Sequence, residues 1–182
     1  MILLLTQNFP PDPGGIESLM GGMAGALADG GREVLILADR HANPDWIAAD
    51  LLAQAEHDTA AQSILITDSA TLAGAVERAV EAALLSLPRA AIAGESWARN
   101  GAIIVARSLE EAAALSDRLA PEHLELLVED PRALFARIRH AGAAFLGGFC
   151  PEALGDYIAG PNHVLPTGRR ARFASGLSVL DY

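Results

Sequence analysis

Residues 33–38 read EVLILA, one of six short apolar runs that alternate with helical patterns along the chain. Continuous runs of this kind are typical of strands that are covered on both faces. The six predicted strands are residues 2–6, 33–38, 63–67, 102–106, 124–128 and 143–147. The alternation predicts an α/β fold, a doubly wound and mostly parallel Rossmann-like sheet of about six strands with right-handed crossovers.

The segments between these strands predict helices, and two of them carry recognisable start signals. An asparagine followed by a proline, at 43–44, is typical of a helix start. A serine and a glutamate three positions apart, Ser108 and Glu111, have the spacing of a capping box. The predicted helices cover residues 44–57, 69–86, 108–119 and 130–142.

The pattern changes after residue 147. Residues 148–182 are rich in glycine and proline, and they predict a long loop that ends in a short strand near 176–181. A loop of this length is more often functional than idle. We therefore expect residues 1–147 to form the Rossmann-like sheet. Residues 148–182 should form an irregular C-terminal segment, a glycine-rich active-site loop with a terminal strand of the same domain.

The composition argues against several classes of function. The 182 residues include 13 basic and 23 acidic side chains, a formal net charge of −10, which disfavours a nucleic-acid or anionic-membrane surface. No stretch approaches the roughly 20 apolar residues of a membrane span. Cys150 is the only cysteine, so no internal disulfide can form, and we expect a reducing, cytoplasmic location. The basic group at 169–172 is interpreted as a solvated loop in preference to an anion site.

Three short segments place histidines or carboxylates in apolar or glycine-rich sequence: QAEH at 54–57, PEHLEL at 121–126 and GDYIAGPNH at 155–163. In the first, Gln54 and His57 share one helix face with Asp50. An amide oxygen and an imidazole nitrogen at this spacing can coordinate one cation. The alternative is a pair of helix-end polar residues that cap backbone carbonyls.

In the second segment, Glu122 and His123 come directly before a predicted strand. A neighbouring glutamate and histidine can divide two proton-transfer roles. The alternative is a helix-terminal histidine that bonds to the last carbonyls. Open α/β sheets usually gather their chemistry at the carboxyl ends of strands, so the amino end of strand 124–128 would be an unusual place for it.

In the third segment, Asp156 and His163 lie in a loop flanked by glycines. Gly155 and Gly160 allow backbone conformations that bring these two side chains close to a ligand. An ordinary turn-rich loop is the alternative.

From about residue 33 to residue 182 the chain resembles histidinol dehydrogenase, the last enzyme of histidine biosynthesis. The resemblance lies in the segments EVLILAD, ANPDWIAADLLAQAEHD, AQSILITD, NGAIIVA, LAPEHLEL, AGAAFLG and PEALGDYIAGPNHVLPTGRRARFASGLSVLD. It implies a zinc-dependent oxidation of L-histidinol to L-histidine, through the aldehyde, with two NAD. It also implies a homodimer with a small-molecule substrate.

The resemblance further implies roles for particular residues. Gln54, His57 and Asp156 correspond to zinc ligands of the family. Glu122 and His123 correspond to the pair that handles protons and activates water. The implied substrate-binding residues overlap with both groups: Gln54, His57, His123, Asp156 and His163. No residue of this chain is implied to bind NAD.

Parts of the family pattern are not found. The family continues beyond LSVLDY into a segment with a further zinc-ligand histidine and a substrate-binding glutamate, both donated across the dimer, and its amino-terminal portion holds most NAD contacts. A substrate-contacting serine expected just before Glu33 is replaced by Arg32. We therefore expect a truncated or chimeric dehydrogenase. An inactive folded chimera or fragment, with residual zinc or ligand binding, is the alternative.

The first 32 residues are expected to have a different origin. The stretch MILLLTQNFPPDPGGIESLMGGMAGALADGGREVLILA resembles the opening strand–loop–helix–strand of family 4 glycosyltransferases, which have a GT-B fold. In that family a Pro-x-Gly-Gly turn leads into a helix near the sugar nucleotide, and the residues here that resemble it are Pro13, Gly14 and Gly15. The paired-glutamate signature of the second domain is not found. A glycosyltransferase-like module is a further alternative, and a plain βα turn is the simpler explanation.

Overall fold

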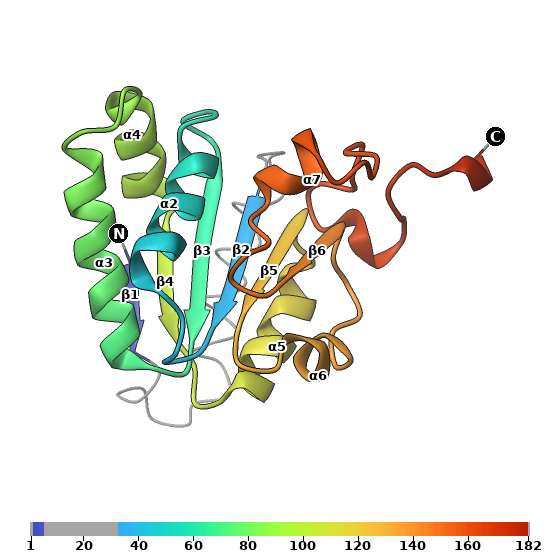
Figure 1. The fold of residues 1–182 in the computed structure, drawn as a ribbon, viewed down its shortest axis with the longest axis horizontal. Helices are drawn as coiled ribbons and strands as arrows, with labels where there is room; N and C mark the ends of the chain where they lie inside the picture. Colours follow the sequence, from blue (N-terminus) through green and yellow to red (C-terminus); the bar gives the residue numbers. More distant parts are fainter. Residues whose placement is uncertain (1, 6–32, 182) are drawn as a thin grey trace.

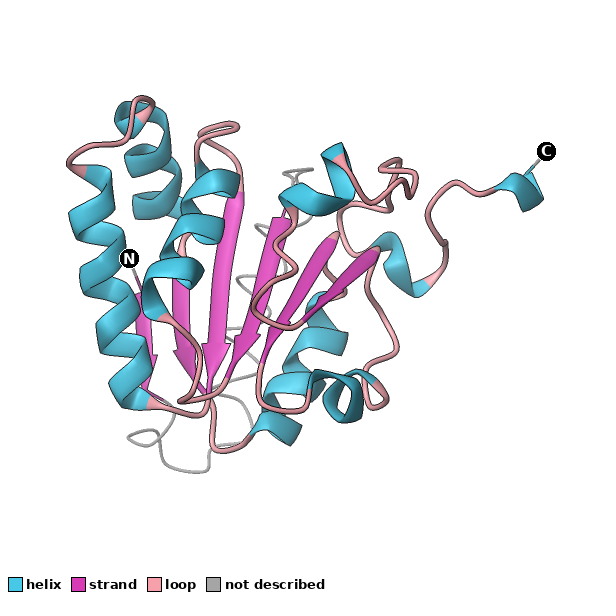
Figure 2. Cartoon of the chain, viewed as in Figure 1, coloured by secondary structure: helices cyan, strands magenta, loops and turns pink. Residues whose placement is uncertain are grey.

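Six parallel strands form one sheet in the computed structural model, which describes residues 2–5 and 33–181. The strands are β1 (Ile2–Leu5), β2 (Glu33–Ala38), β3 (Gln62–Thr67), β4 (Ala102–Val105), β5 (His123–Leu127) and β6 (Ala143–Leu146). Their order is β1-β4-β3-β2-β5-β6, and every pair in the described residues is parallel (Figures 1 and 2). The predicted strands are confirmed to within about a residue.

Helices cover both faces of the sheet. They are α2 (Pro44–Ala55), α3 (Ala70–Leu84), α4 (Ala90–Asn100), α5 (Leu109–Leu119) and α6 (Pro131–Phe135). Side chains of β2 alternate between the two apolar cores: Val34 packs with α2, α3 and α4, whereas Leu35 packs with α5 and α6. This alternation follows from the two-residue period of a strand, and it confirms the doubly wound arrangement.

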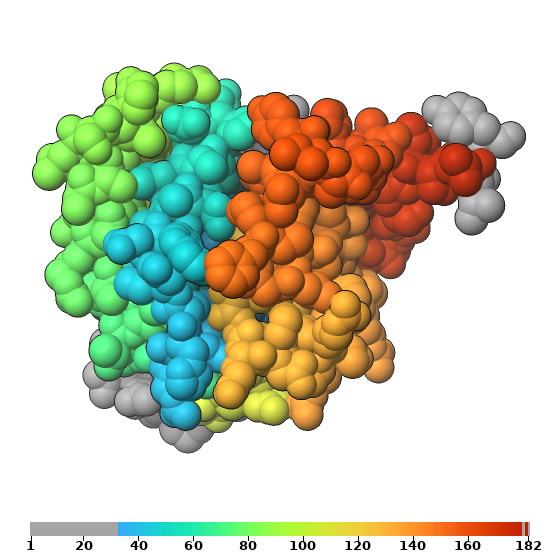
Figure 3. Space-filling model, viewed as in Figure 1, coloured from blue at the N-terminus to red at the C-terminus, as the bar shows by residue number. Residues whose placement is uncertain are grey.

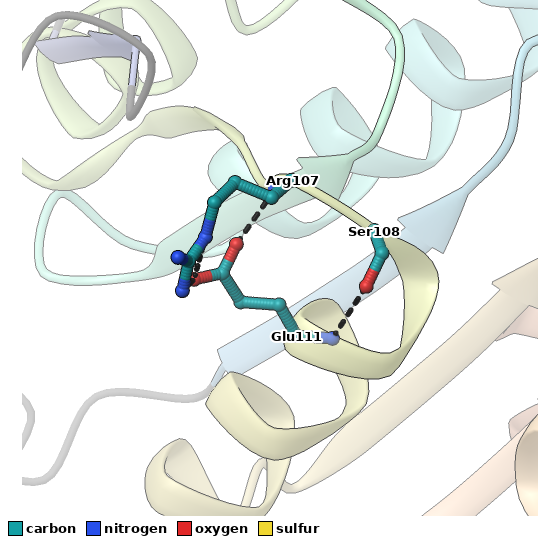
Figure 4. A network of polar contacts seen from close by, with 3 residues as sticks. All are labelled: Arg107, Ser108 and Glu111. Carbon is teal, nitrogen blue, oxygen red and sulfur yellow. Dashed lines mark hydrogen bonds and ion pairs between the residues drawn. The ribbon is translucent and has the colours of Figure 1, made fainter.

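The predicted helix start signals are present. The side chain of Asn43 accepts a hydrogen bond from the backbone N–H of Asp45 at 2.9 Å, and that of Ser108 accepts one from Glu111 at 3.3 Å. The Glu111 carboxylate does not return to Ser108. It accepts from the backbone N–H of Arg107 at 2.6 Å and from the Arg107 guanidinium (Figure 4). The capping box is therefore shifted by one residue.

The structure corrects three expectations. Helix α4 was not predicted, and α6 ends at Phe135, well before residue 142. The expected strand near 176–181 is wrong, because a 3₁₀ turn covers Val179–Asp181. The late loop also contains helix α7 (Ala153–Tyr157) and a 3₁₀ turn at Arg170–Arg172. The division of the chain at residue 147 stays a prediction.

Helix α7 and the last turn of α2 lie at the amino ends of the strands, opposite the arrowheads (Figure 1). The residues around α7 lie directly against α2 in the space-filling view (Figure 3). Beyond α7, the last described residues extend away from the sheet. Several large apolar side chains after residue 148 are exposed: Phe149, Tyr157, Ile158, Phe173 and Val179. In the described residues, no helix is long and apolar enough to cross a membrane.

Candidate metal and acid–base site

One side of α2 faces the beginning of β5. The carboxyl group of Asp50 is hydrogen-bonded to that of Glu125 in β5. Gln54 follows Asp50 one turn later on the same face of α2, and His57 lies in the turn just after the helix ends at Ala55, nearer the amino ends of the strands. The Asp50–Glu125 contact shows that this side of α2 faces β5, and the helix ends two residues before His57, earlier than predicted.

The side chain of Gln54 is buried but its amide is not saturated. Gln54 is only 1% exposed, and its Nε2 has no hydrogen-bond partner among the described residues. Leaving a buried donor unpaired costs about 1–3 kcal/mol, and in Gln54 that donor bonds to no carbonyl of the helix end. Gln54 is therefore not a residue that merely caps the helix.

The imidazole of His57 is oriented by its own helix. Its Nδ1 lies 2.8 Å from the carbonyl oxygen of Ala53. Because a carbonyl can only accept, Nδ1 carries a proton, and in the neutral ring Nε2 keeps a lone pair. This is the second contact that metal-binding histidines commonly make. His57 thus bonds to a backbone carbonyl of α2, as the alternative interpretation expects, and its Nε2 remains able to bind a cation.

Glu122 and His123 are both buried where β5 begins. The backbone N–H of Glu122 donates to Oε1 of Glu33 at 3.2 Å. His123 Nε2 lies 3.7 Å from Oε1 of Glu152, and its ring centroid lies 6.1 Å from that of Phe145. Glu152 therefore faces the imidazole directly, and it can stabilise the protonated ring.

Two arginine side chains of the late segment donate hydrogen bonds to the last carbonyls of α5. The guanidinium of Arg169 donates to the carbonyl of Arg118 at 2.9 Å, and that of Arg172 donates to the carbonyls of Arg118 and Asp117. Cations at a helix C-terminus are stabilised by the helix dipole. The interpretation of this basic group as a solvated loop is thus wrong for Arg169 and Arg172. They hold the late segment against the helix that leads into Glu122.

Helix α7 brings two carboxylates to His123. The helix packs closely on the Phe145 ring at Gly155, where an added Cβ would lie 2.8 Å from that ring. Glu152 and Asp156 are one turn apart on the helix. Of the described histidine, cysteine, aspartate and glutamate residues, one group could hold a metal. It consists of His123, Glu152 and Asp156, whose ligand atoms all lie within 4.8 Å of one another.

A cavity of about 360 Å³ opens beside this group. Its walls include His123, Asp156 and His163, with backbone from the beginning of β6. His163 Nδ1 lies 3.7 Å from Oδ1 of Asp156. A volume of this size is within the usual range for small-molecule pockets, roughly 300–1,000 Å³. The late loop is therefore more than an ordinary turn-rich connection.

Buried acids surround the group. Burial raises the pKa of Glu33 to about 8 and that of Glu125 to about 9. Burial, and then repulsion by Asp156, raises the pKa of Glu152, whereas His57 lowers it. Glu33 and Glu125 therefore keep their protons near neutral pH, because burial disfavours the charged form of a carboxyl group.

The structure thus unites part of the predicted set. His123, Asp156 and His163 meet at the cavity, and Glu122 adjoins them. His57 acts on Glu152 electrostatically but is not a member of the three-residue group. The metal-ligand and catalytic assignments stay predictions. Sequence reasoning missed Glu152, although its i, i+4 spacing from Asp156 was a usable signal.

Comparisons with a family model, with curated sequences and with solved structures all point to the same family. A sequence model described as histidinol dehydrogenase matches residues 19–182. Histidinol dehydrogenase from Cereibacter sphaeroides is 67% identical over 84% of this chain and 35% of the relative. The one from Zymomonas mobilis is 56% identical over 91% of this chain and 39% of the relative. The crystal structure of histidinol dehydrogenase from Elizabethkingia anophelis superposes with a TM-score of 0.80 and 42% identity, over 83% of this chain and 35% of that one.

These matches show how much of the relatives' length the chain covers and which residues of the chain the family model includes. The chain spans a little over a third of the length of the curated relatives it matches. The family match begins at residue 19, so it includes residues 19–32, which we had expected to lie outside the family. The glycosyltransferase-like interpretation of the first 32 residues is not supported, and residues 6–32 lie outside the described part of the structure. The chain belongs to the histidinol dehydrogenase family.

Proposed function

We propose that this chain carries the proton-transfer residues and part of the metal site of a histidinol dehydrogenase. The reaction would be oxidation of L-histidinol to L-histidine, through the aldehyde, with two NAD. The observation that carries the proposal is the meeting of His123 from β5 with Glu152 and Asp156 from α7, beside a ligand-sized cavity. The names of the relatives support the choice of substrate.

The donor set fits zinc. Gln54, His57 and Asp156 would hold the ion, and they offer only nitrogen and oxygen atoms, as expected for a zinc that is not purely structural. The contact of His57 Nδ1 with the Ala53 carbonyl, which leaves Nε2 available to a cation, supports this assignment. When bound, zinc would fix the imidazole and amine of the substrate in one pose.

The acid–base roles follow from burial and position. His123 would take the proton of the substrate alcohol, and Glu152 at 3.7 Å would stabilise the imidazolium that results. Glu122, buried next to it, would activate the water that the second oxidation requires. No residue in the described part of the chain is assigned to NAD, so these roles concern proton transfer alone.

A second candidate function is binding without turnover. The chain spans a little over a third of the length of its relatives, and in this alternative it binds zinc or histidinol but oxidises neither substrate nor aldehyde. Both candidates include a homodimer and a cytoplasmic location, which the family implies. The exposed Phe149, Tyr157 and Phe173 give such a dimer apolar surface to bury.

Zinc binding tests the metal site. We expect the Gln54→Ala and Asp156→Asn variants to bind zinc roughly tenfold or more weakly than the wild-type chain, because each removes a ligand. Competition with a chromophoric chelator would measure the affinities. Asp68→Asn is the matched control, since Asp68 is exposed and follows β3 at the opposite edge of the sheet. Unchanged zinc affinity in Gln54→Ala would refute its role as a ligand.

NADH formation tests the acid–base pair. With L-histidinol, NAD and zinc, we expect His123→Asn and Glu122→Gln to lower kcat about 100-fold or more, the usual contribution of general acid–base catalysis. The half-buried His140, between α6 and β6, supplies the control variant His140→Asn. A wild-type chain that binds zinc yet forms no NADH at high concentration would favour the second candidate function.

A further inference from the structure

Glu125 is an acid in the middle of an apolar strand. It is 0% exposed, and its neighbours in β5, Leu124 and Leu126, belong to the apolar core. Along β5 it points to the same side as His123, toward α2. Burying a carboxyl group at such a position is costly unless it is hydrogen-bonded.

Two different segments bond to this one side chain. Glu125 Oε1 accepts a hydrogen bond at 3.3 Å from the backbone N–H of Glu152, the residue at which α7 begins. The Asp50 carboxyl, on α2, is hydrogen-bonded to Glu125 as well. A single side chain in β5 thus touches both α2, which carries Gln54 and leads into His57, and the start of α7, which carries Asp156.

The bond between Glu125 and Asp50 requires a proton. Glu125 Oε2 is buried, and no N–H or O–H donor among the described residues reaches it. Two carboxyl groups can share a hydrogen bond only when one of them is protonated, and Glu125, fully buried where Asp50 is only half-buried, is the one that keeps the proton. The raised pKa of Glu125, caused first by burial and then by the charge of Asp50, agrees with this placement.

We propose that Glu125 is a positioning residue for the site described above: its side chain, in contact with Asp50 and with the backbone N–H of Glu152, ties α2 to the start of α7. In this way it holds Glu152 and Asp156 opposite Gln54 and His57. The effect on zinc binding rests on the proposed function, whereas the tie between β5 and α7 does not. Glu125 itself does not line the cavity beside α7.

Amide hydrogen exchange in the metal-free chain tests the tie directly. Glu125→Met keeps the volume but removes both hydrogen bonds, and we expect the Glu152 amide to exchange roughly tenfold or more faster. In Glu125→Gln, Oε1 still accepts from Glu152 and Nε2 still donates to Asp50, so exchange should stay within about threefold of wild type. Amides of β2 and β3 serve as an internal reference. Unchanged exchange at Glu152 in Glu125→Met would overturn the proposal.

Zinc titration gives the second readout. We expect Glu125→Met to bind zinc roughly tenfold more weakly than wild type, and Glu125→Gln to bind it about equally. Weak binding in both variants would overturn the positioning role. A wild-type chain that binds no zinc would instead contradict the proposed function, and hydrogen exchange would still decide the tie.

Variants of Asp50 cover the case in which Glu125→Met does not fold. Asp50 is half-buried, so its replacement is less disruptive. Asp50→Asn keeps an oxygen that accepts from Glu125, whereas Asp50→Ala does not. We expect Asp50→Ala alone to weaken zinc binding, by roughly threefold or more, because α2 is no longer held. Equal zinc affinities in the two variants would overturn the proposal.

Discussion

Gly101→Ala is expected to lower the free energy of unfolding by roughly 3–5 kcal/mol, near the upper end for a single substitution. Gly101 ends helix α4 at a φ of −73° and ψ of 142°, which alanine also adopts, so backbone strain is not the cause. The cause is steric. An added Cβ would lie 2.3 Å from Cε3 of Trp97 and 2.5 Å from the Trp97 carbonyl oxygen. The ring is buried in the core, and the carbonyl belongs to the helix, so neither can move aside.

Urea unfolding would measure this loss, and α4 supplies a matched control. Gly94 lies in the interior of the same helix, and no described atom comes within 4 Å of a Cβ added there. Gly94→Ala should therefore raise the free energy of unfolding by about 0.5–1 kcal/mol, through helix propensity. A neutral Gly101→Ala variant would mean that Trp97 repacks freely.

We expect the free energy of unfolding to depend on pH because the pKa of Glu33 is raised in the folded chain. Burial, together with repulsion by Glu122, raises the pKa of Glu33 to about 8, although a backbone hydrogen bond from Glu122 and the charge of Arg169 lower it. The folded chain therefore holds a proton that the unfolded chain releases near pH 4.5. Its stabilising effect is complete below that pH and is lost as the pH rises to about 8. At about 1.4 kcal/mol per pKa unit, the upper bound is roughly 5 kcal/mol.

Glu33→Gln isolates this contribution. A glutamine keeps the oxygen that accepts from the Glu122 N–H but has no proton to lose. We expect the free energy of unfolding of the variant, minus that of the wild type, to rise between pH 4.5 and 8 and then level off. Glu81→Gln, at an exposed position on α3, should show no such rise. A difference that stays flat across this range would show that Glu33 ionises at its ordinary pKa in the folded chain.

Much of the fold could be predicted from local sequence. Continuous apolar runs such as EVLILA identify buried parallel strands, because both faces of such a strand need apolar cover. Helix starts were readable where one residue determines the geometry, as with Asn43 and Ser108. By contrast, α4 and α7 depend on packing. Helix α4 rests on Trp97 and Ala93 in the core, and α7 on Phe145 beneath Gly155.

The candidate site was predicted only in part for the same reason. The face of α2 follows from spacing, and the position before β5 follows from chain order. Which acids meet His123 depends on where the late segment folds back, and no local pattern determines that. Glu152 and the Glu125–Asp50 pair were therefore missed, although a glutamate inside an apolar strand is a signal in its own right.

The site joins residues that are far apart in the sequence, and this separation affects when the site can form during synthesis. Glu122 bonds to Glu33, 89 residues earlier, and Glu152 bonds to Glu125, 27 residues earlier. The ribosome releases β2 and α2 long before α7, and contacts between distant residues form late because closing large loops costs entropy. A nascent chain interrupted after β6 would therefore hold a nearly complete sheet and still lack Glu152 and Asp156. Solubility of such a product would say little about whether the residues of the candidate metal site had ever come together.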